Sequence, residues 1–147
     1  MSDIALIATN LHRCSSVLGR IADRKLQDEY DLGMSQFKIL WMLKKHESGV
    51  LQTTIASWLS QTEAAVSRQI GVLKGEGLIE KKTDPKNRRN HIIVLTREGN
   101  NFAEEAMQML VKEYKPLFNK LTNKEQEALN GMLEKVFFTA CEYFPKP

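Results

Sequence analysis

The sequence has little of what several classes of protein require. Its two cysteines, Cys14 and Cys141, are too few for a disulfide framework, which favours a reducing cytoplasm. Its three histidines, His12, His46 and His91, lack the spacing of metal ligands, so we expect no metal site. No apolar run approaches the ~18 residues of a membrane span. The acidic start MSDIALIATN does not fit a signal peptide. We therefore expect a cytoplasmic protein without a membrane segment.

Catalytic patterns are also missing. We find no nucleophile paired with a base, no metal cluster and no glycine-rich phosphate loop, so the sequence predicts neither an enzyme nor a bound cofactor. What the 147 residues do contain is 42% apolar residues, enough for a folded core. This length fits one domain with a dimerisation appendage.

The positive charge is concentrated in one quarter of the chain. The segment 62–97 has eight basic and four acidic residues, a net charge of +4, whereas the whole chain carries +3. The rest of the chain is therefore slightly acidic. Such a distribution is typical of a protein that meets phosphates with one face. A solvated loop beside a helix would also give this pattern, so charge alone does not decide.

Helical periodicity dominates both ends of the sequence. Near the N-terminus, apolar residues at steps of three and four predict a helix to about Tyr30, and Ser35 is expected to cap the next helix. From Arg97 the helical pattern returns, and Pro116 is expected to kink or end that helix. Thr122 and Glu125 form a capping box for a last helix. The N-terminal apolar stripe comprises Ile4, Ile7, Leu11, Cys14, Leu18 and Ile21.

The middle of the chain predicts two helices joined by a tight turn, followed by a β-hairpin. A short helix is expected over 53–59. The next helix begins after Thr62 or, if Ser60 and Glu63 form a capping box, two residues earlier. It runs to about Gly75 and buries an apolar face (Val66, Ile70 and Leu73). Strands over 78–83 and 91–96 then flank a long basic loop without glycine.

This order of elements is that of a winged helix-turn-helix. The major groove of DNA admits one α-helix, and side chains near its N-terminus read the base edges. Arginine suits guanine, glutamine suits adenine, and alanine or a threonine methyl can contact the thymine methyl. An arginine at the hairpin tip can enter a narrow minor groove. The candidate major-groove residues are Thr62, Ala64, Ala65, Ser67, Arg68 and Gln69, and the candidate wing residues are Lys86, Arg88 and Arg89.

Four motifs in this order, AVSRQIGVL, GLIEK, DPKNRR and VLTREG, resemble the MarR family of transcription regulators. The resemblance implies a mainly α fold with a small two- or three-stranded β wing, in which a winged helix-turn-helix is flanked by N- and C-terminal dimerisation helices. Residues 1–32 and 98–147 would form the dimerisation helices, and residues 33–97 the DNA-binding lobe. The function implied is an effector-responsive repressor that binds a pseudo-palindromic operator as a homodimer.

The resemblance also implies roles for single residues. Arg68 matches a position where the family often places a base-contacting arginine, and Arg89 matches the wing-tip arginine that enters the minor groove. The family's aspartate two residues before that arginine is Asn87 here. Asn87 can accept a hydrogen bond from Arg89 but adds no ionic pairing.

Three further questions stay open at this point. Some relatives use cysteines for redox sensing, but Cys14 and Cys141 fall on apolar helical faces, which favours core packing over a redox role. A pocket for a small aromatic effector could be lined by Trp41, Phe102, Met107 and Met109, although their spacing indicates only a core. The alternative to DNA binding is a protein-interaction module whose basic wing docks an acidic partner.

Overall fold

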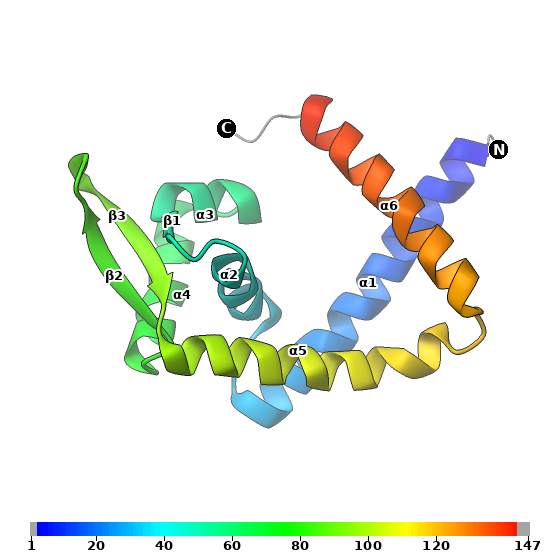
Figure 1. The fold of residues 1–147 in the computed structure, drawn as a ribbon, viewed down its shortest axis with the longest axis horizontal. Coiled ribbons are helices and arrows are strands. Elements are labelled where there is room, and N and C mark those ends of the chain that lie inside the picture. The colour runs from blue at the N-terminus through cyan, green and yellow to red at the C-terminus, as the bar shows by residue number, and fades with distance from the viewer. Residues whose placement is uncertain (1–2, 144–147) are drawn as a thin grey trace.

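The computed structural model describes residues 3–143, which form six helices and a three-stranded antiparallel sheet (Figure 1). Two residues of the expected N-terminal segment and four of the expected C-terminal segment lie outside this range. The fold class predicted from the sequence is confirmed. In chain order the elements are α1 (Asp3–Tyr30), α2 (Met34–Lys44), β1 (Val50–Leu51), α3 (Gln52–Leu59), α4 (Glu63–Gly75), β2 (Ile79–Asp84), β3 (Asn87–Leu95), α5 (Arg97–Phe118) and α6 (Asn123–Tyr143).

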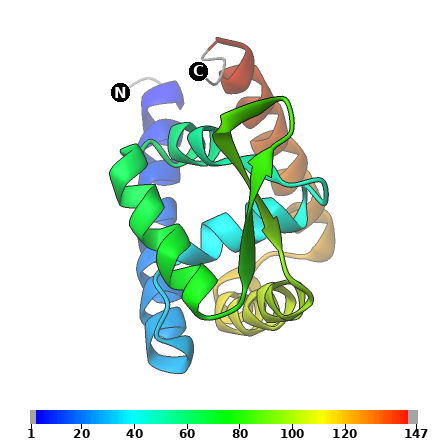
Figure 2. The same ribbon diagram turned by 90° about the vertical axis from the view of Figure 1, so that its left-hand side faces the viewer.

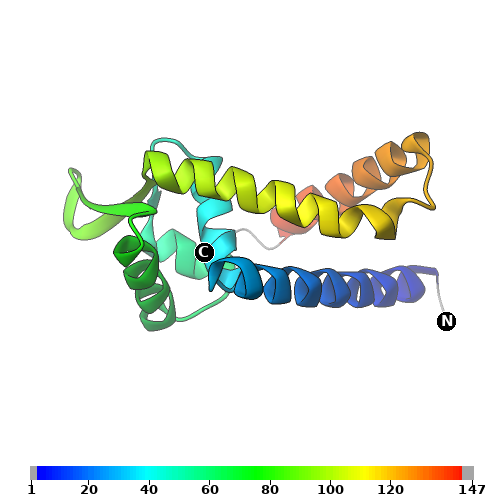
Figure 3. The same cartoon turned by 90° about the horizontal axis from the view of Figure 1, so that it is seen from below.

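The molecule is elongated, with the β2–β3 hairpin at one end. The N-terminal half of α1 and the helix α6 lie at the opposite end, as Figures 1 and 3 both show. Helix α5 runs between the two ends. Pro116 lies inside the last turn of α5, and the helix ends two residues later at Phe118, close to the end that the sequence predicts from this proline.

One hydrophobic core fixes α2, α3, α4 and the sheet to one another. The fully buried side chains include Leu40 and Leu43 of α2, Ile55 of α3 and Ile93 of β3. The face of α4 that the sequence predicts to be apolar is buried here too, at Val66, Ile70 and Leu73. Burial of each such side chain stabilises the fold by about 1.5–3 kcal/mol. This core therefore holds α4 rigidly, with its other face turned to solvent.

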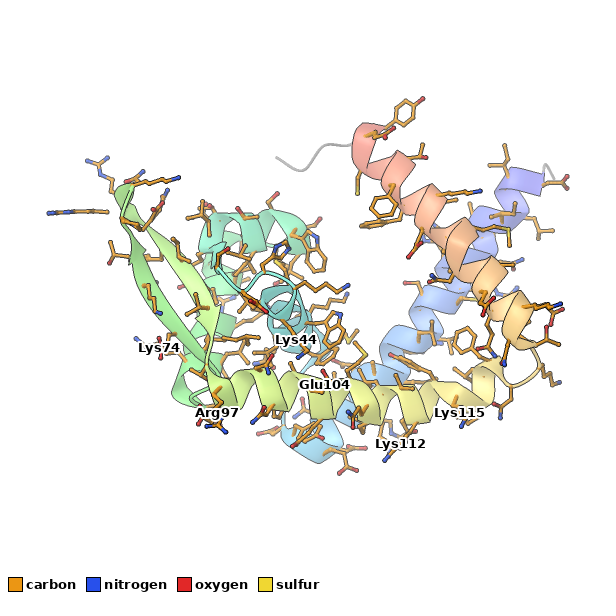
Figure 4. The ribbon with its side chains drawn as sticks, in the orientation of Figure 1. Lys44, Lys74, Arg97, Glu104, Lys112 and Lys115 are labelled. Carbon is orange, nitrogen blue, oxygen red and sulfur yellow. The ribbon has the colours of Figure 1, made fainter. Side chains whose placement is uncertain are left out.

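A second, smaller core attaches α1 and α5 to α2. It contains Ala22 and Leu26 of α1, and Ala106 and Leu110 of α5. A polar contact adds to it, since the Lys44 ammonium lies 3.2 Å from a carboxylate oxygen of Glu104 and donates to Asn100 Oδ1 at 2.9 Å; Lys44 and Glu104 are labelled in Figure 4. Helices α1 and α5 are therefore packed against the unit formed by α2, α3 and α4.

Two helix starts test the expected caps. Ser35 does not cap α2, because the helix begins two residues earlier, with Gly33 at the N-cap and the Gly33 N–H donating to Gln36 Oε1 at 2.7 Å. The capping box of α6 is confirmed. The Thr122 N–H donates to Glu125 Oε2 at 2.7 Å, and the Glu125 N–H donates to Thr122 Oγ1 at 3.3 Å. The hydrogen bonds that Thr122 donates to this carboxylate lower the pKa of Glu125.

The wing is a tight hairpin rather than two strands around a long loop. Strand pairing continues to Asp84 and Asn87, with an irregularity at Thr83, so Pro85 and Lys86 alone form the turn. The expected long loop is therefore wrong, and the arginines lie on β3. The reason is local turn chemistry: Asp84 Oδ1 accepts from the Lys86 N–H at 2.8 Å, which closes the turn without glycine.

Candidate nucleic-acid interface

The turn between α3 and α4 sets the start of α4. Ser60 ends α3 in the left-handed conformation, with φ of 53°, and the Gln61 N–H donates to Ala56 O at 3.0 Å. Thr62 is then the N-cap of α4, and its Oγ1 accepts from the Ala65 N–H at 3.2 Å. Of the two predicted starts, the one at Thr62 is therefore correct. The first residues of α4, Glu63 and Ala64, are exposed beside this turn.

The outward face of α4 consists of small residues around one arginine. Ala64, Arg68, Gly71 and Gly75 recur at steps of four, three and four and so share one side of the helix, opposite the buried face. All four are exposed, and a Cβ added at either glycine would meet nothing within 4 Å. The remaining predicted major-groove residues comprise the exposed Thr62 and Ser67 and the half-buried Ala65 and Gln69.

Gln69 differs from its predicted neighbours because its side chain turns toward the protein. Its Nε2 donates to Gln61 Oε1 at 2.8 Å, and Gln61 Nε2 donates to Ser35 Oγ at 3.2 Å. Sequence reasoning missed this contact, because Gln61 lies eight residues away on the turn before the helix.

The wing carries its basic residues at the tip, at the same end of the molecule as α4 (Figure 1). Lys86, Arg88 and Arg89 are all exposed. Asn87 Oδ1 accepts a hydrogen bond from Arg89, as expected, but from its backbone N–H at 3.1 Å rather than its guanidinium. Figure 2 looks onto this end of the molecule and shows α4 and the hairpin next to each other. A polar cavity of about 90 Å³, lined by Glu63 and Arg89 among others, lies between them.

Four cationic side chains of this surface form no ion pair with an acid of the described residues. Within residues 3–143, no carboxylate oxygen lies within 4.0 Å of Arg68, Lys86, Arg88 or Arg89. Lys82 differs, because its ammonium lies 3.5 Å from a carboxylate oxygen of Glu80. Helix α4 and the wing therefore present unpaired positive charge on one end of the molecule, which attracts polyanions.

The two cysteines do not occupy the core position expected for them. Both thiols are free, Cys14 on α1 is exposed, and Cys141 on α6 is half-buried. The expectation of core packing is wrong for Cys14 within one chain, because the N-terminal half of α1 packs against little else. Cys14 instead lines a cavity of about 470 Å³ between α1 and the end of α5, together with Arg13, Val17 and Phe118.

The residues suggested for an effector pocket pack around the second core. Trp41, Phe102, Met107 and Met109 are all partly buried there. Phe102 also contacts the Tyr30 ring edge-on, with centroids 4.8 Å apart, and lines a cavity of about 350 Å³ to which the other three do not contribute. These four side chains thus serve mainly as packing.

The described part of the chain offers no cluster of three or more histidine, cysteine, aspartate or glutamate residues that could hold a metal ion. None of its helices combines the length and apolar character that crossing a membrane requires.

Comparison with known proteins agrees with this geometry. Residues 32–91 match a family model described as "MarR family". The chain is 30% identical over 131 residues to the HTH-type transcriptional regulator YwaE of Bacillus subtilis, covering 88% of this chain and 75% of that protein. Among solved structures, a MarR-family transcriptional regulator from Rhodococcus sp. RHA1 superposes with a TM-score of 0.80 at 19% identity, over 95% of this chain and 97% of the other.

The fold is also similar to that of the Staphylococcus aureus regulator MepR in complex with DNA, with a TM-score of 0.71 and 25% identity over 91% of this chain and 97% of MepR. The exposed α4, the basic hairpin, the family match and the similarity to YwaE lead to one conclusion. The chain belongs to the MarR family and is a transcriptional regulator.

Proposed function

We propose that this regulator binds double-stranded DNA as a homodimer, with α4 in the major groove and the wing tip in the adjacent minor groove. The proposal is carried by two exposed arginines at one end of the molecule, Arg68 and Arg89, which form no ion pair within the described residues. MepR, whose fold is similar, is known in complex with DNA. Acting on DNA in a bacterial or archaeal cell implies a cytoplasmic location.

Arg68 is the proposed base reader of α4. Small neighbours on the outward face (Ala64, Gly71 and Gly75) let the helix axis approach the groove floor closely, and a guanidinium there suits O6 and N7 of guanine. Ala64, Ala65 and the methyl group of Thr62 suit thymine methyl groups, and the hydroxyl of Ser67 suits either a base edge or a phosphate. Arg68 is expected to supply most of the sequence preference of this helix.

The wing is proposed to fix the protein on the duplex. Its side chains project beyond the core, where Arg89 can enter a narrow, negative minor groove. Lys86 and Arg88 at the same tip are expected to contact phosphates, because phosphate contacts outnumber base contacts in such interfaces. The turn at Asp84 and the Asn87 hydrogen bond hold the tip in shape.

Dimerisation is proposed because one chain leaves large apolar surfaces uncovered at the end away from the wing. Helix α6 has no buried residue, and its Val136, Phe137 and Phe138 are 55%, 55% and 63% exposed. On α1, Ile4 and Ile7 are 78% and 56% exposed. Contiguous apolar surface of this kind marks an interaction site. A second copy is the proposed partner, with residues 1–32 and 98–147 as the dimerisation region and 33–97 as the DNA-binding lobe.

A two-fold dimer repeats its recognition helix about one helical turn apart, which predicts a pseudo-palindromic operator with that half-site spacing. A dimer seated across such an operator would exclude other proteins from the same DNA. Repression is therefore the proposed mode of regulation.

Control by a small aromatic effector is proposed at the cavity lined by Arg13, Val17 and Phe118. Its volume of about 470 Å³ is within the range of small-molecule sites, and Arg13 supplies a cation for an acidic group. A phenolic acid that binds there should raise the melting temperature and change the affinity for the operator, and an Arg13→Ala variant should lose both effects. Unchanged melting and DNA affinity for every ligand tested would remove this part of the proposal.

A redox response through Cys14 and Cys141 is the competing form of control. It predicts a disulfide-linked dimer on a non-reducing gel after peroxide treatment, reversible by dithiothreitol. An unchanged monomer band together with unchanged DNA binding would exclude it.

Selection of bound duplexes from a random pool, followed by a salt titration of the best sequence, tests DNA binding itself. We expect retention of a two-fold symmetric sequence and an affinity that falls steeply with salt. If no duplex is retained at ~50 mM salt while an acidic protein is bound, the alternative function, a protein-interaction module, is favoured instead.

A further inference from the structure

Three polar side chains from three parts of the chain form a continuous hydrogen-bonded series. Gln69 on α4 donates from Nε2 to Oε1 of Gln61 on the turn, over 2.8 Å. Gln61 donates from its own Nε2 to Oγ of Ser35 in the first turn of α2, over 3.2 Å. The second polar atom of Gln69, Oε1, is buried and has no partner within residues 3–143.

The position of Gln69 on α4 accounts for this orientation. Successive residues of a helix lie about 100° apart, so Gln69 is turned away from the outward face that Arg68 occupies and toward the buried face. Gln69 is half-buried, whereas Arg68 is exposed. A glutamine that reads adenine needs both its amide N–H and its amide oxygen free. Here one N–H of the Gln69 amide is bonded to Gln61, and the protein covers the oxygen, so the paired contact with adenine cannot form.

The series continues toward the proposed dimerisation helices. Next to Ser35, the Met34 N–H donates to Oδ1 of Asp23 on α1, over 2.8 Å. The start of α2 is thus bonded on one side to α4, through Gln61, and on the other side to α1. These hydrogen bonds therefore lie between α4 and a proposed dimerisation helix.

We propose that Gln69 is a positioning residue and not a base-reading residue. With Gln61 and Ser35 it fixes α4 against α2, and so places Arg68 for the base contact. The inference rests on the proposed function and deepens it, because it assigns sequence preference to Arg68 and its outward neighbours and removes Gln69 from the reading set.

The test uses Gln69→Met and Gln61→Met, which keep the side-chain length but lose the amide. Both variants, the double variant and the wild type are compared on a library with a randomised half-site and on a set of single duplexes. We expect Gln69→Met to bind every duplex about two- to tenfold more weakly, the effect of one net hydrogen bond. Gln61→Met loses both of its hydrogen bonds and should bind at least as weakly. The order of base preferences should not change. The double variant should be no weaker than Gln61→Met alone, because Gln61→Met already removes the contact that Gln69→Met loses.

Loss of preference at any base pair in Gln69→Met would overturn the inference, since Gln69 would then read that base. Wild-type affinity in all variants, or multiplied losses in the double variant, would overturn it as well. If either methionine variant fails to fold in a thermal melt, Ser35→Ala replaces it, because this substitution removes the hydroxyl that accepts from Gln61 at the end of the series. Failure of the wild type to bind any duplex would instead refute the proposed function.

Discussion

Replacing Arg68 with alanine separates DNA recognition from folding. The side chain is exposed, and no carboxylate of the described residues lies within 4.0 Å of its guanidinium, so its removal leaves neither a cavity nor an unpaired partner. The unfolding free energy should therefore change by less than ~0.5 kcal/mol. Loss of a bidentate contact with guanine should cost about 1–3 kcal/mol, which is roughly a 5- to 150-fold rise in Kd.

The assay is fluorescence anisotropy with the selected operator and with duplexes altered at one base pair. Lys74→Ala is the matched control, because Lys74 is another exposed cation of α4, in its last turn. The Lys74→Ala variant should bind all duplexes slightly more weakly, and by the same factor. Arg68→Ala should in addition lose its preference at one base pair of each half-site. An Arg68→Ala protein with wild-type affinity and base preference would refute the assignment of Arg68 to the DNA-reading face. A large fall in melting temperature would refute the claim that the Arg68 side chain does not stabilise the fold.

Four further outcomes are expected. Arg89→Ala should weaken binding to all duplexes and lower the slope of log affinity against log salt by about 1, measured by a salt titration; an unchanged slope would place the wing away from the DNA. Gly99→Ala should lower the unfolding free energy, measured in urea, by ~1–3 kcal/mol or more, because the added Cβ would lie 1.8 Å from the carbonyl oxygen of Leu78. Gly71→Ala, whose Cβ would meet open space, should not lower the stability of the protein. Equal stability of the two variants would contradict this packing. Phe137→Glu should leave the helical circular dichroism intact but give the mass of a single chain in light scattering, since the exposed Phe137 lies on the proposed dimer face. An unchanged dimer mass would remove α6 from the interface. The hydrogen bonds that Thr122 donates lower the pKa of Glu125. The Glu125 carboxylate should therefore stabilise α6 at a pH above its pKa in the unfolded chain, and this stabilisation should be lost as the pH falls through its pKa in the folded protein. An NMR titration midpoint at or above that of an ordinary glutamate would contradict the capping geometry.

Local signals made α4 predictable from the sequence. Thr62 is an N-cap residue, and the buried face repeats at helical spacing through Val66, Ile70 and Leu73. Both features depend only on residues within a few turns of one another. The same is true of the capping box before α6. Periodicity and caps therefore located the elements that matter for binding.

The wing was harder to predict because its tip has no apolar alternation. Residues 87–90 are all polar and project beyond the core, so the strand pattern is missing where β3 begins. The turn is closed by the Asp84 side chain rather than by glycine. A hairpin built in this way resembles a long basic loop when only the sequence is read.

Contacts between distant residues could not be predicted. Gln69 is a polar residue in the N-terminal half of α4, next to Arg68 in the sequence, and only the structure reveals its bond to Gln61. Likewise, the apolar stripe of α1 predicts a helix with one apolar face, but not that its own chain leaves Ile4 and Ile7 exposed. The sequence periodicity identifies such a face, and only the tertiary structure shows what covers it.

The central claim is that two chains, joined through α1 and α6, present Arg68 and Arg89 twice to one duplex. The most direct measurement is the mass of the protein–DNA complex in solution, on a duplex with two half-sites about one helical turn apart. We predict two 16.8 kDa chains per duplex and much weaker binding when one half-site is scrambled. A complex with one chain per duplex, or equal affinity for the scrambled duplex, would contradict the claim.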